Sequence, residues 1–305
     1  MPAGRSEDTS AADSQSAGAL ASLLEILDLA PVETNFFRGV SPSDRWQRVY
    51  GGQVLGQALV AASRTVEGRL CHSLHAYFLR AGDPRRPILY EVDRSRDGRS
   101  FSARRVVAIQ HGAPIFTMSA SFETAEAGLE HQSPMPEVPY PEELKTEQQW
   151  RSEIVSQLPE HVRGWFMRGR PIEFRPVVPE NRFRAEKQKP KQTLWFRAAA
   201  PLPESHALHQ CVLAYASDMT LLDTSMVPHG RTLFEKSIMA ASLDHALWFH
   251  RPFRADDWLL YVQESPSAAG TRSFNRGEIF RRDGVLAASV AQEGLVRVRA
   301  SAPES

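Results

Sequence analysis

Residues 73–80 read SLHAYFLR, and a similar string, SLDHALWFHR, occupies residues 242–251. Further matching strings follow each of them in the same order. SFSARRVVAIQHG at 100–112 leads to TMSASFE, and SFNRGEIFRRDG at 273–284 leads to AASVAQE. Every matched pair is separated by nearly the same distance along the chain, and such a constant offset indicates a duplication. We therefore expect two diverged copies of one structural unit.

Each copy has the pattern of one helix with several strands. The string YGGQVLGQALVAASRTV carries a stripe of small residues at helical spacing, and small residues let a sheet wrap closely around a helix. The predicted helices are Ala21–Leu29, Tyr50–Val66, one around Pro141–Leu158, and Ala207–Leu222. The predicted strands are Phe36–Val40, Leu74–Leu79, Ile88–Asp93, Ser100–Gln110, Pro114–Glu123, Gln192–Arg197, Ile238–Phe249, Trp258–Glu264, Ser273–Arg281 and Val285–Val298. This order predicts an α+β fold in which two tandem antiparallel sheets each wrap around a long central helix.

The same patterns divide the chain into four parts. Residues 1–20 are rich in Ser, Ala, Gly and Asp and predict a disordered tail. The first copy spans 21–125 and the second spans 191–300. Residues 126–190 form a connection between them, which is rich in proline and therefore leaves little room for regular sheet.

Composition excludes several classes of protein. The 305 residues include 36 basic and 36 acidic side chains, and a zero net charge argues against a polybasic nucleic-acid binder. Cys71 and Cys211 cannot form a disulfide framework or a multi-cysteine metal site, and we expect both to be small core residues. The histidines show no metal-ligand spacing. No apolar run reaches the roughly 20 residues that span a bilayer. We expect a cytoplasmic protein without a bound metal.

Several long strings resemble the type II acyl-CoA thioesterases, a family that includes bacterial thioesterase II and related peroxisomal enzymes. These strings are YGGQVLGQAL, HSLHAYFLRAGDP, RDGRSFSARRVVAIQHG, LAYASDMTLL, SLDHALWFHRPF and VAQEGLVR. The resemblance covers roughly residues 23–297. It implies a double hotdog fold and hydrolysis of fatty acyl-CoA to free acid and CoA without a cofactor. It also implies a homo-oligomer, a dimer or a tetramer.

The resemblance also implies a catalytic trio. It places the acid at Asp218, the hydroxyl at Ser242 and the amide at Gln292. The bacterial pattern has Thr where this chain has Ser242, and both residues offer one hydroxyl group. Asp218 would act as general base for a water molecule that Ser242 and Gln292 help to hold. Helical spacing independently places Asp218 at the edge of an apolar stripe, where partial burial would raise the pKa of its carboxyl group.

The substrate-binding predictions concern the first copy. Gly51, Gly52 and Gln53 lie at the start of the predicted helix Tyr50–Val66, whose backbone N–H groups could bind the developing oxyanion of the substrate. Glycine would let the ligand approach the backbone closely. His75 is a second candidate, as a general base or a substrate contact. Its neighbours Ser73 and Tyr77 share its strand face, so packing on a sheet face is an alternative reading.

The duplication predicts a single site of this kind in each chain. Alignment of the copies matches Asp218 with Ala61, Gln292 with Phe122, and Ser242 with Ser73. The first copy therefore lacks the acid and the amide. We expect it to serve as a scaffold and as one wall of the substrate channel.

Two other functions remain open on sequence grounds. A hotdog hydratase or dehydratase would use His75 with a nearby carboxylate, and a non-catalytic acyl-CoA binding protein would need no base. Asp244 and His245 are adjacent on a strand, point to opposite faces and are expected to be structural. One arginine of the pair Arg104–Arg105 could meet CoA phosphates, although a solvated strand edge fits the pattern better.

Overall fold

The computed structural model describes residues 5–42, 48–158, 160–178 and 187–299. Its helices are α1 Arg5–Leu27, α2 Gly51–Ser63, α3 Glu147–Ile154, α4 Glu160–Phe166 and α5 His206–Ser217, with short 3₁₀ turns η1 Pro141–Glu143, η2 Val155–Gln157, η4 Leu222–Ser225 and η5 Val227–His229. Its strands are β1 Ala30–Glu33, β2 Phe36–Gly39, β3 Leu70–Phe78, β4 Ile88–Asp97, β5 Phe101–Gln110, β6 Ala113–Glu123, β7 Ile172–Pro176, β8 Lys191–Ala198, β9 Ile238–Ser242, β10 Asp244–Phe249, β11 Leu259–Ala269, β12 Arg272–Arg281 and β13 Leu286–Val298.

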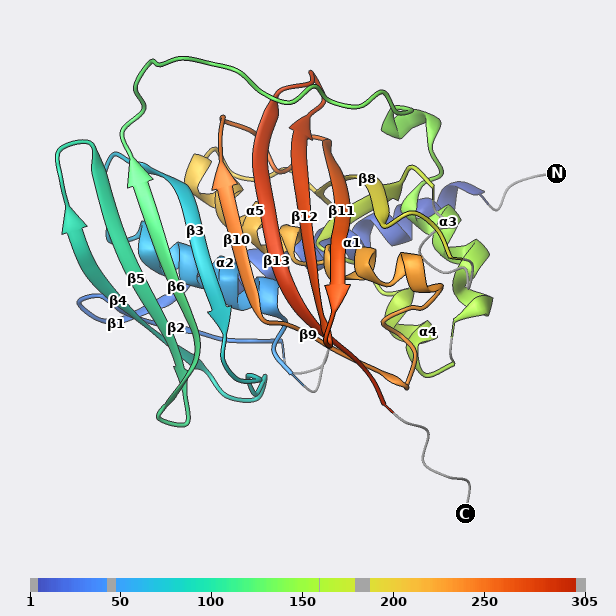
Figure 1. The fold of residues 1–305 in the computed structure, drawn as a ribbon, viewed down its shortest axis with the longest axis horizontal. Coiled ribbons are helices and arrows are strands. Elements are labelled where there is room, and N and C mark those ends of the chain that lie inside the picture. The colour runs from blue at the N-terminus through green and yellow to red at the C-terminus, as the bar shows by residue number, and fades with distance from the viewer. Residues whose placement is uncertain (1–4, 43–47, 159, 179–186, 300–305) are drawn as a thin grey trace.

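One continuous antiparallel sheet carries the strands of both copies. Its order is β1-β2-β4-β5-β6-β3-β10-β13-β12-β11-β8-β7, and β9 pairs with β13 outside this path. Outward from the central pair β3–β10, the two halves repeat the same succession of strands. Helices α2 and α5 lie behind the sheet and contact each other (Figure 1). The fold is the double hotdog, as predicted.

Alternating burial shows why these strands wrap around the helices. In β3, Leu74 and Ala76 are buried against the core, and in β10 the residues Leu247 and Phe249 are buried. The pair Leu74–Leu247 lies where the two halves of the sheet meet. Helix α2 is buried from Gly52 to Ala62, because its own residues are mostly small or apolar on every side.

The duplication seen in the sequence is consistent with the strand register. Ser102 of β5 lies opposite Phe122 of β6, and Asn275 of β12 lies opposite Gln292 of β13. The aligned strings match Asn275 with Ser102 and Gln292 with Phe122, at nearly the same offset along the chain. A cross-strand pair in one copy thus corresponds to a cross-strand pair in the other.

The N-terminal region differs from the prediction. Residues from Arg5 to Leu20 are helical and belong to α1, so the prediction of a disordered tail is wrong for them. Leu20, Leu23 and Leu27 are buried in the main core, and α1 contacts α2 and β7. This burial anchors the C-terminal part of the helix, which most short helices need in order to be stable.

The connection between the copies also contains more structure than predicted. After β6 the chain crosses along one end of the sheet to η1, where Trp195 Nε1 donates a hydrogen bond to the carbonyl oxygen of Pro139 at 2.9 Å (Figure 1). It then forms α3 and α4, and β7 pairs with β8 as an edge strand. Pro176 is tolerated at the end of β7 because an edge strand leaves one side unpaired.

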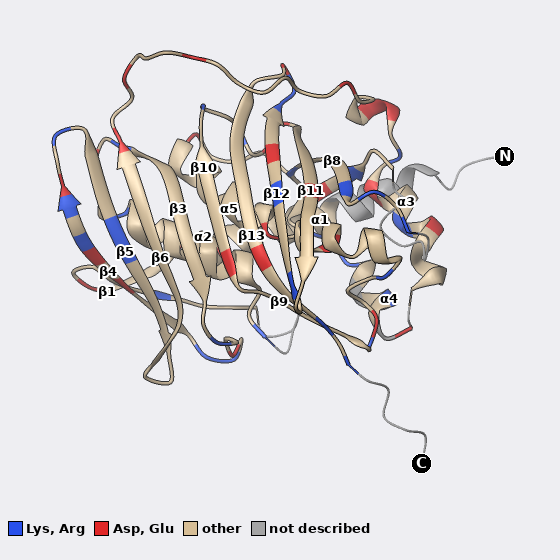
Figure 2. Ribbon diagram, in the orientation of Figure 1, with Lys and Arg blue, Asp and Glu red and all other residues tan. Residues whose placement is uncertain are grey.

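Charged residues of both signs share the strands. In Figure 2 the ribbon is coloured blue at basic and red at acidic residues, and both colours occur along β4 and β12. Arg276 pairs with Glu264 on the neighbouring strand, and Arg272 Nε lies 2.9 Å from Glu293 Oε1. This local pairing agrees with the zero net charge of the chain.

Candidate active site

Asp218 is the buried carboxylate of the site. It follows α5 directly as the C-cap residue, so the predicted helix Ala207–Leu222 ends earlier than expected. Its Oδ1 accepts hydrogen bonds from Gln292 Nε2 at 2.5 Å and from Ser242 Oγ at 3.1 Å, and the backbone N–H of Gly52 also bonds to the carboxylate. Burial raises the pKa of Asp218 to about 6, and these hydrogen bonds only partly oppose the rise.

Ser242 and Gln292 reach Asp218 from neighbouring strands. Ser242 ends β9 and lies opposite Gly294 of β13, two residues beyond Gln292. Gln292 Nε2 donates to Ser242 Oγ at 3.0 Å, while Gln292 Oε1 is buried with no partner among the described residues. The three residues that the sequence predicted as a catalytic trio thus lie within hydrogen-bonding distance of one another.

The N-terminus of α2 closes the other side of the carboxylate. A Cβ atom on Gly51 would lie 2.8 Å from Asp218 Oδ2, and one on Gly52 would overlap the carbonyl oxygen of Tyr215. Only glycine at these positions allows α2 to approach the end of α5. Two of the three predicted oxyanion donors already have partners. The N–H of Gly52 bonds to Asp218 and that of Gln53 bonds to the carbonyl oxygen of Tyr50, so the predicted oxyanion site would use the N–H of Gly51.

The side chain of Gln53 does not face Asp218. Its Nε2 donates to Ser41 Oγ at 2.7 Å and to the carbonyl oxygen of Val40 at 3.2 Å. Gln53 is buried and holds the segment that follows β2. Its predicted role as a substrate contact therefore has no support from its side-chain position.

His75 lies apart from the site. It alternates along β3 with Leu74 and Ala76, which point into the core, so it faces the opposite side of the sheet. Its ring is exposed and packs edge-to-face on Trp248 with centroids 5.1 Å apart. The structure thus supports the alternative reading of His75 as part of a packed sheet face.

His245 belongs to the site, although the sequence analysis assigned it a structural role. It is fully buried on β10, with Nδ1 3.2 Å from Gln292 Nε2 and 4.0 Å from Asp218 Oδ1. The predicted strand Ile238–Phe249 is interrupted at Leu243, which separates β9 from β10. Because the alternation restarts there, Ser242 and His245 can both reach Gln292. The buried Leu247 and Phe249, at period two from His245, are the sequence signal that could have revealed its inward direction.

Further polar groups line the inner face of the second half-sheet. Asn275, directly opposite Gln292, is fully buried, and neither of its amide atoms has a partner among the described residues. Gln263 on β11 hydrogen-bonds Thr220 and Thr224. No prediction singled out these residues, because isolated amides within strands carry no distinctive spacing.

Several remaining predictions concern residues away from the site. Cys71 and Cys211 are buried free cysteines, as expected. Arg104 is buried rather than solvated, and it donates to Thr65 and to Asp97, so it is not placed to meet a phosphate group. In the described part of the chain, no group of His, Cys, Asp and Glu could hold a metal ion, and no helix is long and apolar enough to cross a membrane.

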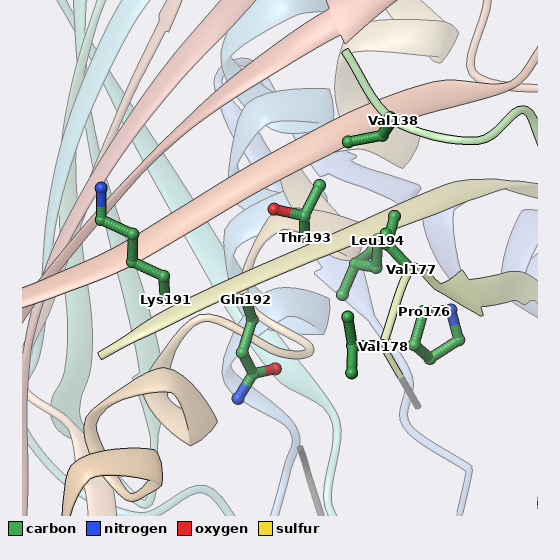
Figure 3. A pocket seen from close by; sticks show the side chains of 8 residues that line it. All are labelled: Val138, Pro176, Val177, Val178, Lys191, Gln192, Thr193 and Leu194. Carbon is green, nitrogen blue, oxygen red and sulfur yellow. The ribbon is translucent and has the colours of Figure 1, made fainter. Parts of the chain in front are cut away.

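A separate pocket of about 140 Å³ lies between β7 and β8 (Figure 3). Its lining is mainly apolar: Val138, Pro176, Val177, Val178, Lys191, Gln192, Thr193 and Leu194. Strands β11 and β12 separate β8 from β13, which carries Gln292. The pocket shares no residue with the cluster around Asp218.

The fold and the site together define a double hotdog protein with a buried, hydrogen-bonded carboxylate. Two family models match the chain: "Acyl-CoA thioesterase" over residues 162–295 and "Acyl-CoA thioesterase N-terminal domain" over residues 41–123. The chain belongs to the acyl-CoA thioesterase family, whose activity is the hydrolysis of acyl-CoA thioesters.

Individual relatives agree with this assignment. Human acyl-coenzyme A thioesterase 8 is 44% identical over 92% of this chain and 90% of its own length. Acyl-CoA thioesterase 2 of Haemophilus influenzae is 40% identical over 91% of this chain and 98% of its own. The crystal structure of acyl-CoA thioesterase II TesB2 from Mycobacterium marinum, 44% identical, matches with a TM-score of 0.75 over 91% of this chain and 99% of that one.

Proposed function

We propose that the chain hydrolyses fatty acyl-CoA with a water molecule activated by Asp218 and oriented by Ser242 and Gln292. The observation that carries this proposal is the Asp218 carboxylate, which is buried among uncharged donors, has a pKa of about 6 and is held by both partners through Oδ1. A base whose pKa lies just below neutrality is ionised at physiological pH and still accepts a proton readily.

The proposed reaction balances without a metal or a cofactor. The water oxygen attacks the thioester carbonyl carbon while Asp218 takes one water proton. The tetrahedral intermediate then collapses, the carbon–sulfur bond breaks, and the proton held by Asp218 passes to the CoA sulfur. The products are the free acid and CoA. The backbone N–H of Gly51, at the N-terminus of α2, is the proposed donor to the oxyanion.

The positions of His75 and Asp218 weigh against the hydratase alternative. A hydratase needs a base and an acid near one carbon atom, whereas His75 lies on the opposite sheet face from Asp218. A pure binding protein would have no need for a buried carboxylate, since burying an ion without a cation costs free energy. The cytoplasmic location, the homo-oligomer and the fatty nature of the acyl group remain predictions.

An assay with acyl-CoA and enoyl-CoA substrates tests this proposal. We expect CoA thiol release from saturated fatty acyl-CoA, unchanged in His75→Ala and reduced about 10²- to 10⁴-fold in Asp218→Asn. Absorbance loss of enoyl-CoA that depends on His75 would support the hydratase instead. Tight acyl-CoA binding without thiol release at any chain length would establish a binding protein.

A further inference from the structure

His245 contacts both the end of α5 and the proposed catalytic amide. Its Nε2 lies 2.9 Å from Ser217 Oγ, and its Nδ1 lies 3.2 Å from Gln292 Nε2. The ring is fully buried on β10 and bridges from Ser217, at the last turn of α5, to β13. Both ring nitrogens thus contact polar atoms of the protein itself.

The hydrogen bonds of Ser217 determine which imidazole nitrogen carries the proton. Ser217 Oγ donates its single hydrogen to the carbonyl oxygen of Ala214 at 3.0 Å. It can then only accept from His245, so His245 Nε2 is the protonated nitrogen and Nδ1 presents a lone pair. Burial also lowers the pKa of His245 to about 3, which keeps the ring neutral at physiological pH.

A lone pair at Nδ1 distinguishes the two ends of the Gln292 amide. With the –NH₂ group toward the site, the two amide hydrogens face three acceptors, His245 Nδ1, Asp218 Oδ1 and Ser242 Oγ, so that one hydrogen is shared between two of them. A flip of the amide, which exchanges its oxygen and nitrogen, would turn Oε1 toward the His245 lone pair and the Asp218 carboxylate. Lone pairs would then face each other in a site of low dielectric constant, where such contacts are costly.

We propose that His245 is a positioning residue for thioester hydrolysis, and that its Nδ1, set by Ser217, holds the Gln292 amide with its nitrogen toward Asp218 and Ser242. This inference rests on the proposed function, because Gln292 matters only if Asp218 activates the water. His245 itself exchanges no proton during the reaction. The carbonyl oxygen of Ser217 accepts a hydrogen bond from Tyr261 OH at 3.1 Å, and this bond fixes the position of Ser217.

Substitution of His245 in the full-length protein tests this role. We expect His245→Leu to lower kcat about 10- to 100-fold with little change in KM, since a misplaced orienting group costs rate more than affinity. His245→Asn retains a polar atom near the position of Nδ1, and we expect it to recover part of the lost kcat. The pH at which activity rises should stay the same in both variants.

Ser217→Ala provides a milder variant that leaves the imidazole in place. It removes the acceptor for Nε2–H, so we expect a smaller loss of kcat and a mixture of His245 tautomers in ¹⁵N spectra of labelled protein. Wild-type protein should show only the Nε2-protonated form. A single Nδ1-protonated tautomer in wild-type protein would overturn the proposal, whatever the activities are.

A matched control separates positioning from general packing. His209 is another buried histidine, whose Nδ1 accepts from the backbone N–H of Ala255 at 3.0 Å. We expect His209→Leu to lower thermal stability but not kcat. Folded His245→Leu with wild-type kcat would overturn the positioning role alone. Full activity in Asp218→Asn, measured in parallel, would instead refute the proposed function on which the role depends.

Discussion

The two copies share a fold and differ at the end of their central helices. The residue that closes α5 is Asp218, and the residue that closes α2 is Arg64, a cation suited to the negative end of a helix dipole. By this criterion Arg64, rather than the Ala61 of the sequence alignment, is the counterpart of Asp218. Neither residue of the first copy is acidic.

The two copies also shift the pKa of a carboxyl group in opposite directions. In the first copy, Arg104 donates to Asp97 at 2.6 Å, and this hydrogen bond with that from Ser102 lowers the pKa of Asp97 to about 2. In the second copy, Asp218 is buried among uncharged donors and its pKa rises to about 6. The same fold therefore holds a structural anion where a cation lies next to the carboxylate. It holds a candidate base where only neutral groups surround the carboxylate.

Among the changes that compare the two copies, the largest expected effect comes from making Gln292 as apolar as its counterpart Phe122. Gln292→Leu removes the donors to Asp218 and Ser242 at nearly constant volume. We expect kcat to fall about 10²- to 10³-fold, the loss typical for a donor that stabilises a transition state. Thiol release measures it. Phe122→Leu is the matched change in the first copy and should leave kcat intact, and equal losses in both variants would remove the functional distinction between the copies.

The next effect concerns the stability of the folded state. Because the pKa of Asp218 is raised in the folded protein, ionisation of this group costs stability as pH rises from about 4 through about 6. Relative to Asp218→Asn, the wild-type protein should lose about 2 kcal/mol of unfolding free energy between pH 4 and pH 8. Urea unfolding of both proteins at several pH values measures this difference. A constant difference would mean that Asp218 is solvated in the folded state.

A smaller effect is expected from breaking the network of the first copy. Arg104→Met removes the half-buried hydrogen bond of 2.9 Å that the guanidinium group donates to the carbonyl oxygen of Thr65. We expect a loss of about 1 kcal/mol in unfolding free energy, because water can partly replace the lost donor at this half-buried oxygen. Activity should not change. A specific rise in KM for CoA esters would instead assign Arg104 to substrate binding.

The sequence predicted the architecture well because its signals are periodic and repeated. The offsets between the copies, the small-residue helix and the alternating strands all depend on local pattern, and they agree with the observed strand order. The resemblance also named Asp218, Ser242 and Gln292, which the structure brings together. The assignment of their catalytic roles stays a prediction.

The remaining features depend on details that local pattern does not encode. The interruption at Leu243 lets Ser242 and His245 reach the same amide, and it is held by a hydrogen bond from Leu243 N–H to the carbonyl oxygen of Glu293, a contact between distant segments. The helical state of Arg5–Leu20 depends on burial of its C-terminal end against α2. Both outcomes follow from tertiary contacts that override composition and alternation.

The last test needs no substitution. It measures kcat/KM of the wild-type protein across pH and shows whether the raised pKa of Asp218 governs turnover. Below about pH 6 the carboxyl group is protonated and cannot accept a proton from water. We therefore expect kcat/KM to fall about tenfold for each pH unit below 6 and to level off above it, since this quantity reports ionisation in the free enzyme. Thiol release with a reagent that works at acid pH measures the profile. A midpoint near 4 would show a carboxyl group with the ordinary pKa of a solvated aspartate, and the difference between the two copies would then not extend to catalysis.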